Sequence, residues 1–292
     1  MKLTSRVAFD SLWIILALAL ASCSLDSGNT ANKANSSRNL TTKTAKAHKA
    51  QDAQTNVAWR PTKEDSIPFT NNAKVKQWVD TFNGSLKPNF TRWIGRLGQY
   101  GPTIEKILKE EGVPKDLIYL AMIESGFNMT ANSSASATGP WQFISSTGKM
   151  YGLDNSFFVD DRSNFEAATR AAAQHLKDLY KVYGDWYLAF AAYNAGPGKV
   201  NSAIKRARTT DYWALSSRKS RYLRQETKDY VPKILAAMYI VKNYKKFGYT
   251  EKSFGDALEF DKVMVPDATD IHVLAKCAGT TAETIQALNP SL

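Results

Sequence analysis

The fold is decided by one stretch of the chain, which begins Leu117-Ile118-Tyr119-Leu120-Ala121-Met122-Ile123-Glu124-Ser125-Gly126-Phe127-Asn128 and ends, after a short polar interval, Gly139-Pro140-Trp141-Gln142-Phe143. Apolar and aromatic residues lead without interruption into the carboxylate of Glu124. A run that is apolar on every face is typical of a helix buried among other helices. Ser125 and Gly126 follow, and glycine commonly ends a helix. The stretch therefore predicts a buried helix with Glu124 at its C-terminal end.

This position is unusual for a carboxylate. Desolvation and the negative end of a helix dipole both raise the pKa of a carboxyl group. A carboxyl group that keeps its proton near neutral pH can act as a general acid, which cleavage of a glycosidic bond requires. On spacing alone, two other interpretations of Glu124 stay open. It could pair with a Lys or Arg for structural reasons, or lie exposed on a frayed last turn.

Several motifs share their order and spacing with those of a known domain. They are Glu124-Ser125-Gly126-Phe127-Asn128, Ser133, Gly139-Pro140-Trp141-Gln142, Ala192-Tyr193-Asn194-Ala195-Gly196 and Glu226-Thr227-Lys228-Asp229-Tyr230-Val231-Pro232. With these motifs, residues 86–248 resemble the soluble lytic transglycosylase (SLT) domain, most closely that of the membrane-bound lytic murein transglycosylase D type. Ser136 and Pro140 stand where the family usually has Gly and Leu. Both could reshape the loop below the acid.

The resemblance implies a mainly α, lysozyme-like domain with a glycan cleft between the Glu124 loop and the elements that carry Tyr193 and Tyr230. Glu124 would be the catalytic residue and would protonate the bond between N-acetylmuramic acid and N-acetylglucosamine in peptidoglycan. The same carboxylate would then take the proton of the muramic C6 hydroxyl as this hydroxyl attacks the anomeric carbon. The product would be a 1,6-anhydro sugar, with no water consumed.

The loop after Glu124 is expected to contact the substrate. By resemblance, Ser133 and Gln142 would hydrogen-bond the substrate or the acid. Trp141 could line the cleft by stacking on a sugar, and packing beneath the loop is the alternative for its ring.

The later motifs are expected to complete the glycan site. By resemblance, Tyr193 places its hydroxyl near the acid and the scissile sugar, and Asn194 helps to hold the loop. On periodicity alone, Tyr193 could instead be a core residue and Asn194 a helix cap. Glu226 and Tyr230 are four positions apart and share one face if the segment is helical. Glu226 would support the substrate sugar, or pair structurally with a nearby Arg.

Two other functions stay open. A hydrolase similar to goose-type lysozyme would need a second carboxylate to activate water, and the sequence does not locate one. A non-catalytic peptidoglycan-binding lipoprotein would tolerate the loss of Glu124.

Residues 1–22 have the layout of a secretory signal. Lys2 and Arg6 precede an apolar run at residues 12–21 that is too short to span a bilayer. The run ends Leu20-Ala21-Ser22-Cys23, which resembles a bacterial lipoprotein signal and implies cleavage before Cys23 with lipid on its sulfur. Ser24 resembles lipoproteins sorted to the outer membrane. We expect an outer-membrane lipid anchor with the domain facing the periplasm; a chance cysteine after an ordinary signal is the alternative.

The remaining chain divides into three parts. Residues 23–67 are rich in small polar residues and in Lys, cannot bury enough apolar surface to offset ordering, and predict a disordered tether. Residues 68–250 form the expected transglycosylase domain, and residues 251–292 form a C-terminal extension. In this extension, a strand at 258–265 and helices at 270–278 and 281–288 weakly resemble the start of a LysM carbohydrate-binding module. A helical tail packed on the main domain is the alternative.

Helical periodicity and capping residues predict the elements of the main domain. Helices are expected from about residue 71, at 90–99, from Pro102, from Pro114, at 142–151, from a Ser163 capping box to Tyr183, up to Gly196, at 200–208, and from Pro232 to residue 246.

Cysteine and histidine usage is sparse. Cys277 is the only cysteine besides Cys23, so no intramolecular disulfide is possible once Cys23 carries lipid. We predict that Cys277 is a small buried hydrophobe. The histidines, His48, His175 and His272, have no metal-ligand spacing, and we expect no metal and no cofactor.

The chain is basic, with a formal net charge of +11. Such a charge can indicate a nucleic-acid partner, but no nucleic-acid motif is present and the chain has an export signal, so none is expected. A cationic patch precedes Glu226 and consists of Arg218, Lys219, Arg221 and Arg224. Peptidoglycan stem peptides and anionic lipid surfaces are the expected counter-charges. A simply solvated surface is the alternative for many of the lysines. The sequence gives no indication of the oligomeric state.

Overall fold

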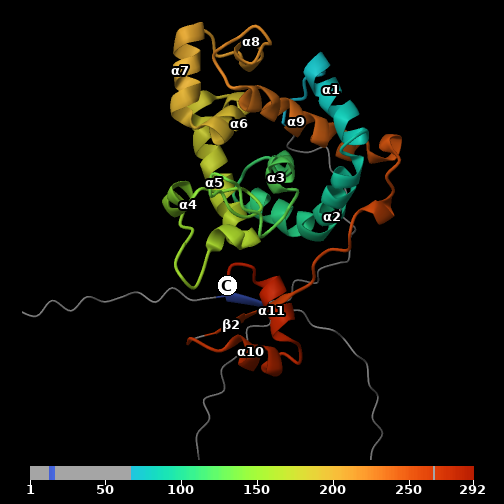
Figure 1. Cartoon of the computed structure of the whole chain (residues 1–292), viewed down its shortest axis with the longest axis vertical. Coiled ribbons are helices and arrows are strands. Elements are labelled where there is room, and N and C mark those ends of the chain that lie inside the picture. Colours follow the sequence, from blue (N-terminus) through green and yellow to red (C-terminus); the bar gives the residue numbers. More distant parts are fainter. Residues whose placement is uncertain (1–12, 17–66, 266) are drawn as a thin grey trace, which may run out of the picture.

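The computed structural model describes residues 13–16, 67–265 and 267–292. The expected secretory signal, the lipidated Cys23 and the disordered tether lie outside the described residues, apart from Trp13–Leu16 and Ile67. The described chain is mainly helical, as the sequence predicts. Figure 1 shows a large helical body and, below it, a small unit around β2, α10 and α11.

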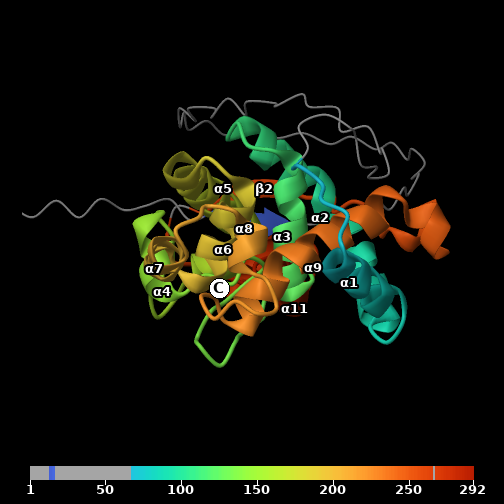
Figure 2. The same ribbon diagram turned by 90° about the horizontal axis from the view of Figure 1, so that it is seen from above.

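The helical body surrounds one short central helix. Its elements are α1 (Ala73–Asn83), α2 (Lys87–Glu110), η1 (Lys115–Leu117), α3 (Ile118–Ser125), α4 (Ser145–Met150), η2 (Asp161–Ser163), α5 (Phe165–Tyr183), α6 (Trp186–Ala195), α7 (Pro197–Ala207), α8 (Tyr212–Leu215), α9 (Gln225–Lys242), η3 (Tyr244–Phe247) and η4 (Glu251–Ser253). In Figure 1, α3 lies inside a ring formed by α2, α5, α6 and α9, and Figure 2 shows it between α6 on one side and α2 and α9 on the other. Among the described residues, no helix is both long and apolar enough to cross a membrane.

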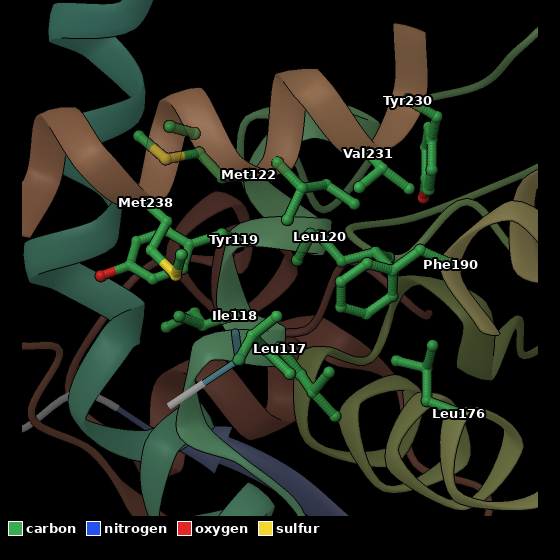
Figure 3. Close-up of a cluster of buried hydrophobic side chains, with 14 of the residues drawn as sticks. Leu117, Ile118, Tyr119, Leu120, Met122, Leu176, Phe190, Tyr230, Val231 and Met238 are labelled. Carbon is green, nitrogen blue, oxygen red and sulfur yellow. The ribbon is translucent and has the colours of Figure 1, made fainter. Parts of the chain in front are cut away.

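The central helix supplies the middle of the hydrophobic core. All side chains from Leu117 to Met122 are at most 1% exposed. Figure 3 shows this run packed against Phe190 of α6, Leu176 of α5, and Val231 on α9. Burial on every side is what an apolar run without a polar face requires. The predicted buried helix is therefore confirmed.

Two helices continue through a proline where the sequence predicted a break. The expected helices on either side of Pro102 are one helix, α2, and Gln225–Lys242 runs unbroken through Pro232 as α9. A proline inside a helix removes one hydrogen bond to the carbonyl four residues earlier. In α9 that carbonyl belongs to Lys228, and the buried Tyr212 hydroxyl donates to it at 3.1 Å and to the Thr227 carbonyl at 3.0 Å. A side chain from α8 thus replaces the donor that Pro232 lacks.

Two helix starts also differ from the expectation. The helix predicted from residue 142 begins at Ser145, because Phe143 pairs through its backbone with Thr138 in both directions (3.0 and 3.1 Å). The cap of α5 is Asn164 rather than Ser163, since the Asn164 side chain accepts from the backbone N–H groups of Glu166 and Ala167, each at 3.2 Å. Asparagine is as good a capping residue as serine.

After η4 the chain crosses α2 as an extended segment, residues 254–260. Gly98 and Gly255 allow the close approach, because a Cβ on Gly98 would lie 2.3 Å from the Gly255 carbonyl oxygen. The Gly255 N–H donates to the Gly95 carbonyl at 3.0 Å, and the Leu258 N–H donates to the Gln99 carbonyl at 2.9 Å. The segment joins the small C-terminal unit firmly to the body.

The C-terminal unit contains β2 (Asp261–Met264), α10 (Ile271–Cys277) and α11 (Ala282–Leu288). β2 is shorter than expected and pairs antiparallel with β1 (Trp13–Leu16), with Trp13 opposite Met264. Ala275 and Ile285 form the buried centre of this unit. The prediction of a buried Cys277 is wrong: the thiol is exposed. Cys277 follows Ala275 by two positions, which places it on the opposite face of the helix.

Candidate active site

The acid lies where α3 ends, and the end of α3 is fixed by its neighbours. Gly126 caps the helix with a left-handed φ of 60°. A Cβ at this position would lie 2.1 Å from Cδ1 of Trp93, so only glycine fits. Arg96 donates to the Gly126 carbonyl at 3.1 Å. Glu124, two residues earlier, is therefore held in one place.

Ser125 connects the helix end to the loop that follows. Its hydroxyl donates to the Pro140 carbonyl at 2.9 Å and accepts from the Asn128 N–H at 3.0 Å. The loop is thus attached directly beside the acid, and Pro140 takes part through its backbone.

Glu124 accepts a short hydrogen bond on Oε1 from the hydroxyl of Tyr230, a residue of α9 that is 4% exposed. The pKa of Glu124 is raised to about 7, chiefly because burial disfavours the carboxylate. The Tyr230 hydrogen bond lowers this pKa, the negative charge of Glu226 raises it, and the ammonium of Lys233 lowers it. Near neutral pH a large fraction of Glu124 therefore carries a proton, as the sequence position predicted.

Tyr193 approaches the acid from α6. Its hydroxyl donates to the Trp141 carbonyl at 2.8 Å. Burial and the negative charge of Glu124 raise the pKa of Tyr193 well above its usual value, so the phenol stays protonated. The ring lies 5.1 Å from the ring of His175. Tyr193 thus supports the loop that contains Trp141, and it lies close enough to Glu124 for the carboxylate charge to raise its pKa.

Ser133 and Gln142 stabilise the loop itself. The Ser133 hydroxyl accepts from the Ala137 N–H at 3.0 Å. Gln142 has a φ of 51°, and its amide donates to the carbonyls of Ala131 (3.1 Å) and Gly139 (2.9 Å). In the described part of the chain neither side chain hydrogen-bonds Glu124. A role toward the substrate stays a prediction for both residues.

Trp141 lies under the loop and not in a cleft. It is 0% exposed, and its indole N–H donates to the Thr169 hydroxyl at 2.9 Å. The ring offers no face to a sugar, so the stacking interpretation is wrong and the packing alternative holds. A Trp with its N–H satisfied in the core contributes mainly through its large buried area.

Asn194 and Glu226 contact each other, whereas Asn194 was expected to hold the loop. The Asn194 amide donates to Glu226 Oε1 at 3.2 Å and accepts from the Thr227 hydroxyl at 2.8 Å. Within residues 67–265, Glu226 forms no ion pair, so the structural pairing with an Arg is not seen. Glu226 and Tyr230 lie on the same face of α9, as their spacing predicted.

Two contributors to the site were missed by the sequence reasoning. Arg162 donates to the loop carbonyls of Ser136 (3.0 Å) and Phe143 (3.2 Å) while it pairs with Asp160 at 2.7 Å. His175 stacks on Tyr151 at 4.9 Å and lies beside Tyr193. Neither residue belongs to a motif, and only contacts between distant segments reveal them. No cluster of metal-ligating side chains occurs among the described residues.

The fold and the site define a class of mainly helical protein in which a partly protonated carboxyl group, that of Glu124, lies at the end of a buried helix. Residues 102–216 match the family described as Transglycosylase SLT domain. This part of the chain is therefore similar to the transglycosylase SLT domain, as the motifs indicated. The match includes Glu124 and Tyr193, while Glu226 and Tyr230 lie beyond it.

Two known proteins are similar in sequence to parts of this chain. The chain is 37% identical over 187 residues to membrane-bound lytic murein transglycosylase D of Escherichia coli strain K12, covering 62% of this chain and 40% of that protein. It is 37% identical over 98 residues to a putative tributyltin chloride resistance protein of Alteromonas sp. strain M-1. That alignment covers 33% of this chain and 47% of that protein. The chain thus spans less than half the length of either relative.

Two solved structures of lytic transglycosylases are also similar to parts of this chain. An inactive mutant of lytic transglycosylase Slt from Pseudomonas aeruginosa has 25% identity and a TM-score of 0.42 over 50% of this chain and 24% of that chain. The 70 kDa soluble lytic transglycosylase of Escherichia coli has 22% identity and a TM-score of 0.46, over 59% of this chain and 29% of that chain.

Proposed function

We propose that this chain is a peptidoglycan lytic transglycosylase that cleaves the β-1,4 bond between N-acetylmuramic acid and N-acetylglucosamine. The observation that carries the proposal is the carboxyl group of Glu124, which lies inside the SLT domain with a pKa raised to about 7. The name of the 37% identical relative, a lytic murein transglycosylase, supports the same reaction and substrate.

In the first step, protonated Glu124 donates its proton to the glycosidic oxygen as the bond to the anomeric carbon breaks. Tyr230 bonds Oε1, which leaves Oε2 as the oxygen that carries the proton to the sugar. As Glu124 becomes a carboxylate, the Tyr230 hydroxyl stabilises the new negative charge. The pKa near 7 suits an acid that must lose and regain a proton in each cycle.

In the second step, the Glu124 carboxylate takes the proton of the muramic C6 hydroxyl while its oxygen bonds the anomeric carbon. This closes a 1,6-anhydro ring, restores the protonated acid and consumes no water. One carboxyl group is sufficient for both steps, whereas hydrolysis normally uses a second carboxylate at a defined separation. Glu226 is close enough to raise the pKa of Glu124 and is the carboxylate that a hydrolase would have to use.

Product analysis tests the reaction type. Glycans released from purified sacculi should end in an anhydro sugar that resists borohydride, and heavy-oxygen water should leave them unlabelled. Glu226→Gln should reduce the rate far less than Glu124→Gln. Reducible, labelled muramic ends as the major product, lost in Glu226→Gln, would make the chain a hydrolase similar to goose-type lysozyme. Binding to sacculi without any cleavage would make it a non-catalytic lipoprotein.

Membrane attachment is part of the proposed function. Cys23 would carry lipid after cleavage of residues 1–22, anchor the chain in the outer membrane and leave the domain in the periplasm. The support is the sequence Leu20-Ala21-Ser22-Cys23-Ser24. β1 belongs to the segment that this cleavage removes, so the mature chain would lose the strand that pairs with β2.

The C-terminal unit would add glycan binding. The order of β2, α10 and α11 supports a partial LysM-like fold. Its attachment to α2 through residues 254–260 would hold a bound glycan close to the helical body.

A further inference from the structure

The acid has a cationic neighbour that the mechanism above leaves unused. Lys233 follows Tyr230 by three positions on α9, so the two side chains lie on the same side of that helix. Tyr230 bonds Glu124, and the positive charge of Lys233 lies near enough to the acid to lower its pKa. Lys233 is half-buried and forms no hydrogen bond or ion pair with any residue that the structure describes. Another kind of contact therefore fixes its ammonium group beside the acid.

That contact is with the indole ring of Trp78. The ammonium nitrogen of Lys233 lies 4.6 Å from the centroid of this ring. A cation within about 6 Å of an aromatic centroid is attracted by the negative face of the ring, and Trp provides the strongest attraction of the aromatic side chains. The attraction is larger when the pair is partly removed from water, and both side chains are half-buried here.

Trp78 is itself fixed by the packing of α1. The buried side chains of this helix are those of Val75, Val79 and Phe82. Trp78 lies on the same face, and its ring centroid is 5.6 Å from that of Phe82. α1 packs against α9, the helix that carries Lys233. A helix outside the part of the chain that matches the SLT domain thus supplies the ring that holds a positive charge beside the acid.

The charge of Lys233 acts on Glu124 together with other groups. The remaining titratable and charged side chains at this end of α3 come from α9, α6 and α2, and they are Tyr230, Glu226, Tyr193 and Arg96. Burial raises the pKa of Glu124 most strongly, and the negative charge of Glu226 raises it further. Lys233 opposes both influences, so the loss of its charge would raise the pKa of Glu124.

We propose that Lys233 and Trp78 are positioning residues of this site: the Trp78 ring holds the Lys233 ammonium beside Glu124, where its charge stabilises the carboxylate that forms as the acid gives its proton to the glycosidic oxygen. The inference rests on the proposed function and adds two residues to the same site. A charge that is already in place stabilises a developing negative charge without reorganisation during the reaction. α1 then contributes to the chemistry as well as to the core.

The pH profile of cleavage tests the role of Lys233. Lys233→Met keeps a long side chain over the ring and removes the charge, so the alkaline limb of kcat/KM should move to higher pH. The maximal rate should fall by roughly 10-fold, in kcat and not in KM, because the lost interaction acts in the transition state. Lys233→Arg retains the charge and should keep the wild-type limb. Lys76→Met removes an exposed lysine of α1 and is the control for net charge.

Variants of Trp78 test how the charge is held. Trp78→Leu frees the ammonium to turn into water, so the alkaline limb should move in the same direction as in Lys233→Met. Trp78→Phe keeps an aromatic face and should move the limb less. In a Lys233→Met background, Trp78→Leu should cause no further shift, because the two residues act as a unit. Shifts that add in the double variant would overturn the assignment of Trp78.

Titration of the acid provides a readout that needs no turnover. With glutamate labelled with ¹³C at the carboxyl carbon, the Glu124 resonance is the one absent from Glu124→Gln. It should titrate near pH 7 in the wild type and at higher pH in Lys233→Met. An unshifted titration in Lys233→Met, or an equal shift in Lys233→Arg, would overturn the assignment of Lys233. The expected titration shift in a chain that cleaves no glycan would instead refute the proposed function, so the two failures are distinct.

Discussion

Tyr230 donates its hydroxyl hydrogen to Oε1 of Glu124, across 106 positions of sequence, and so joins α9 to the end of the central helix. The bond stabilises the charged form of a carboxyl group that burial keeps protonated. Burial and this bond are the two largest of the influences that bring the pKa of Glu124 to about 7. The residue is therefore neither fully neutral nor fully ionised near neutral pH.

Glu124→Gln should abolish cleavage while binding to sacculi persists. Glutamine keeps the size but cannot donate a proton as a carboxylic acid does, and general acid catalysis typically contributes about 100- to 10,000-fold. Product release from sacculi measures the first effect and a pull-down with sacculi measures the second. If the variant loses binding to sacculi as well as cleavage, Glu124 is required for the folded structure. Near-normal cleavage would remove it from the mechanism.

Tyr230→Phe should move the pH profile. The lost hydrogen bond normally lowers the pKa of Glu124, so without it the pKa rises and the alkaline limb of the rate profile shifts to higher pH. The maximal rate should fall by roughly 10- to 100-fold, because a hydrogen bond to a charged group is lost. Rates of cleavage measured from pH 5 to 9 provide the check. An unshifted limb with a lower rate would show that Tyr230 does not act through the acid.

His175 should make the fold sensitive to mild acid. Burial against Tyr151 and Tyr193 lowers the pKa of His175 to about 4, and its Nδ1 has no hydrogen-bond partner among the described residues. The unfolded chain takes up a proton near pH 6.5 and the folded chain does not, so stability falls as the pH drops from 6.5 through 4. The loss should reach at most about 3 kcal/mol.

Urea unfolding at pH 7 and pH 5 checks this expectation. His175→Phe keeps an aromatic ring in the stack. This variant should remove most of the difference in the free energy of unfolding between pH 7 and pH 5. His272→Gln is the matched control, because His272 is exposed, and it should behave as wild type. An unchanged pH difference in His175→Phe would assign the acid sensitivity to other groups.

Cys23→Ala should abolish lipid attachment, because the thiol sulfur is the atom to which the lipid would be bonded. Radiolabelled palmitate followed by membrane fractionation checks the result in cells. Label on wild type and none on the variant is the expected outcome. Label retained by Cys23→Ala, or an unlabelled and soluble wild type, would contradict the lipoprotein interpretation.

The sequence predicted the parts of the fold that depend on local pattern. The apolar run before Glu124 predicted the buried helix, and Gly126 predicted its end, because both signals are carried by neighbouring residues. The raised pKa followed from the same burial. The continuity of α9 was not predictable, since Pro232 is tolerated through the hydroxyl of Tyr212, a residue of another helix.

The finer organisation of the site depends on contacts between distant segments. The sequence left two interpretations of Trp141 open, stacking in the cleft and packing beneath the loop. In the structure its N–H donates to Thr169 and its ring fills the core. Arg162 binds the loop carbonyls from η2, and no periodicity marks such a contact. Sequence motifs identified which segments form the site, and tertiary packing decides which side chains face the substrate.

The pairing of Tyr212 with Pro232 has an evolutionary consequence. While Pro232 is present, the Tyr212 hydroxyl supplies the hydrogen bond to the Lys228 carbonyl that the proline cannot donate, so loss of the hydroxyl removes this donor. Substitutions at these two positions should therefore be inherited together: a relative with Phe at position 212 would be expected to carry a residue with a backbone N–H at position 232. A hydroxyl in α8, remote from the chemistry, thereby restricts which mutations the helix of Tyr230 can accept.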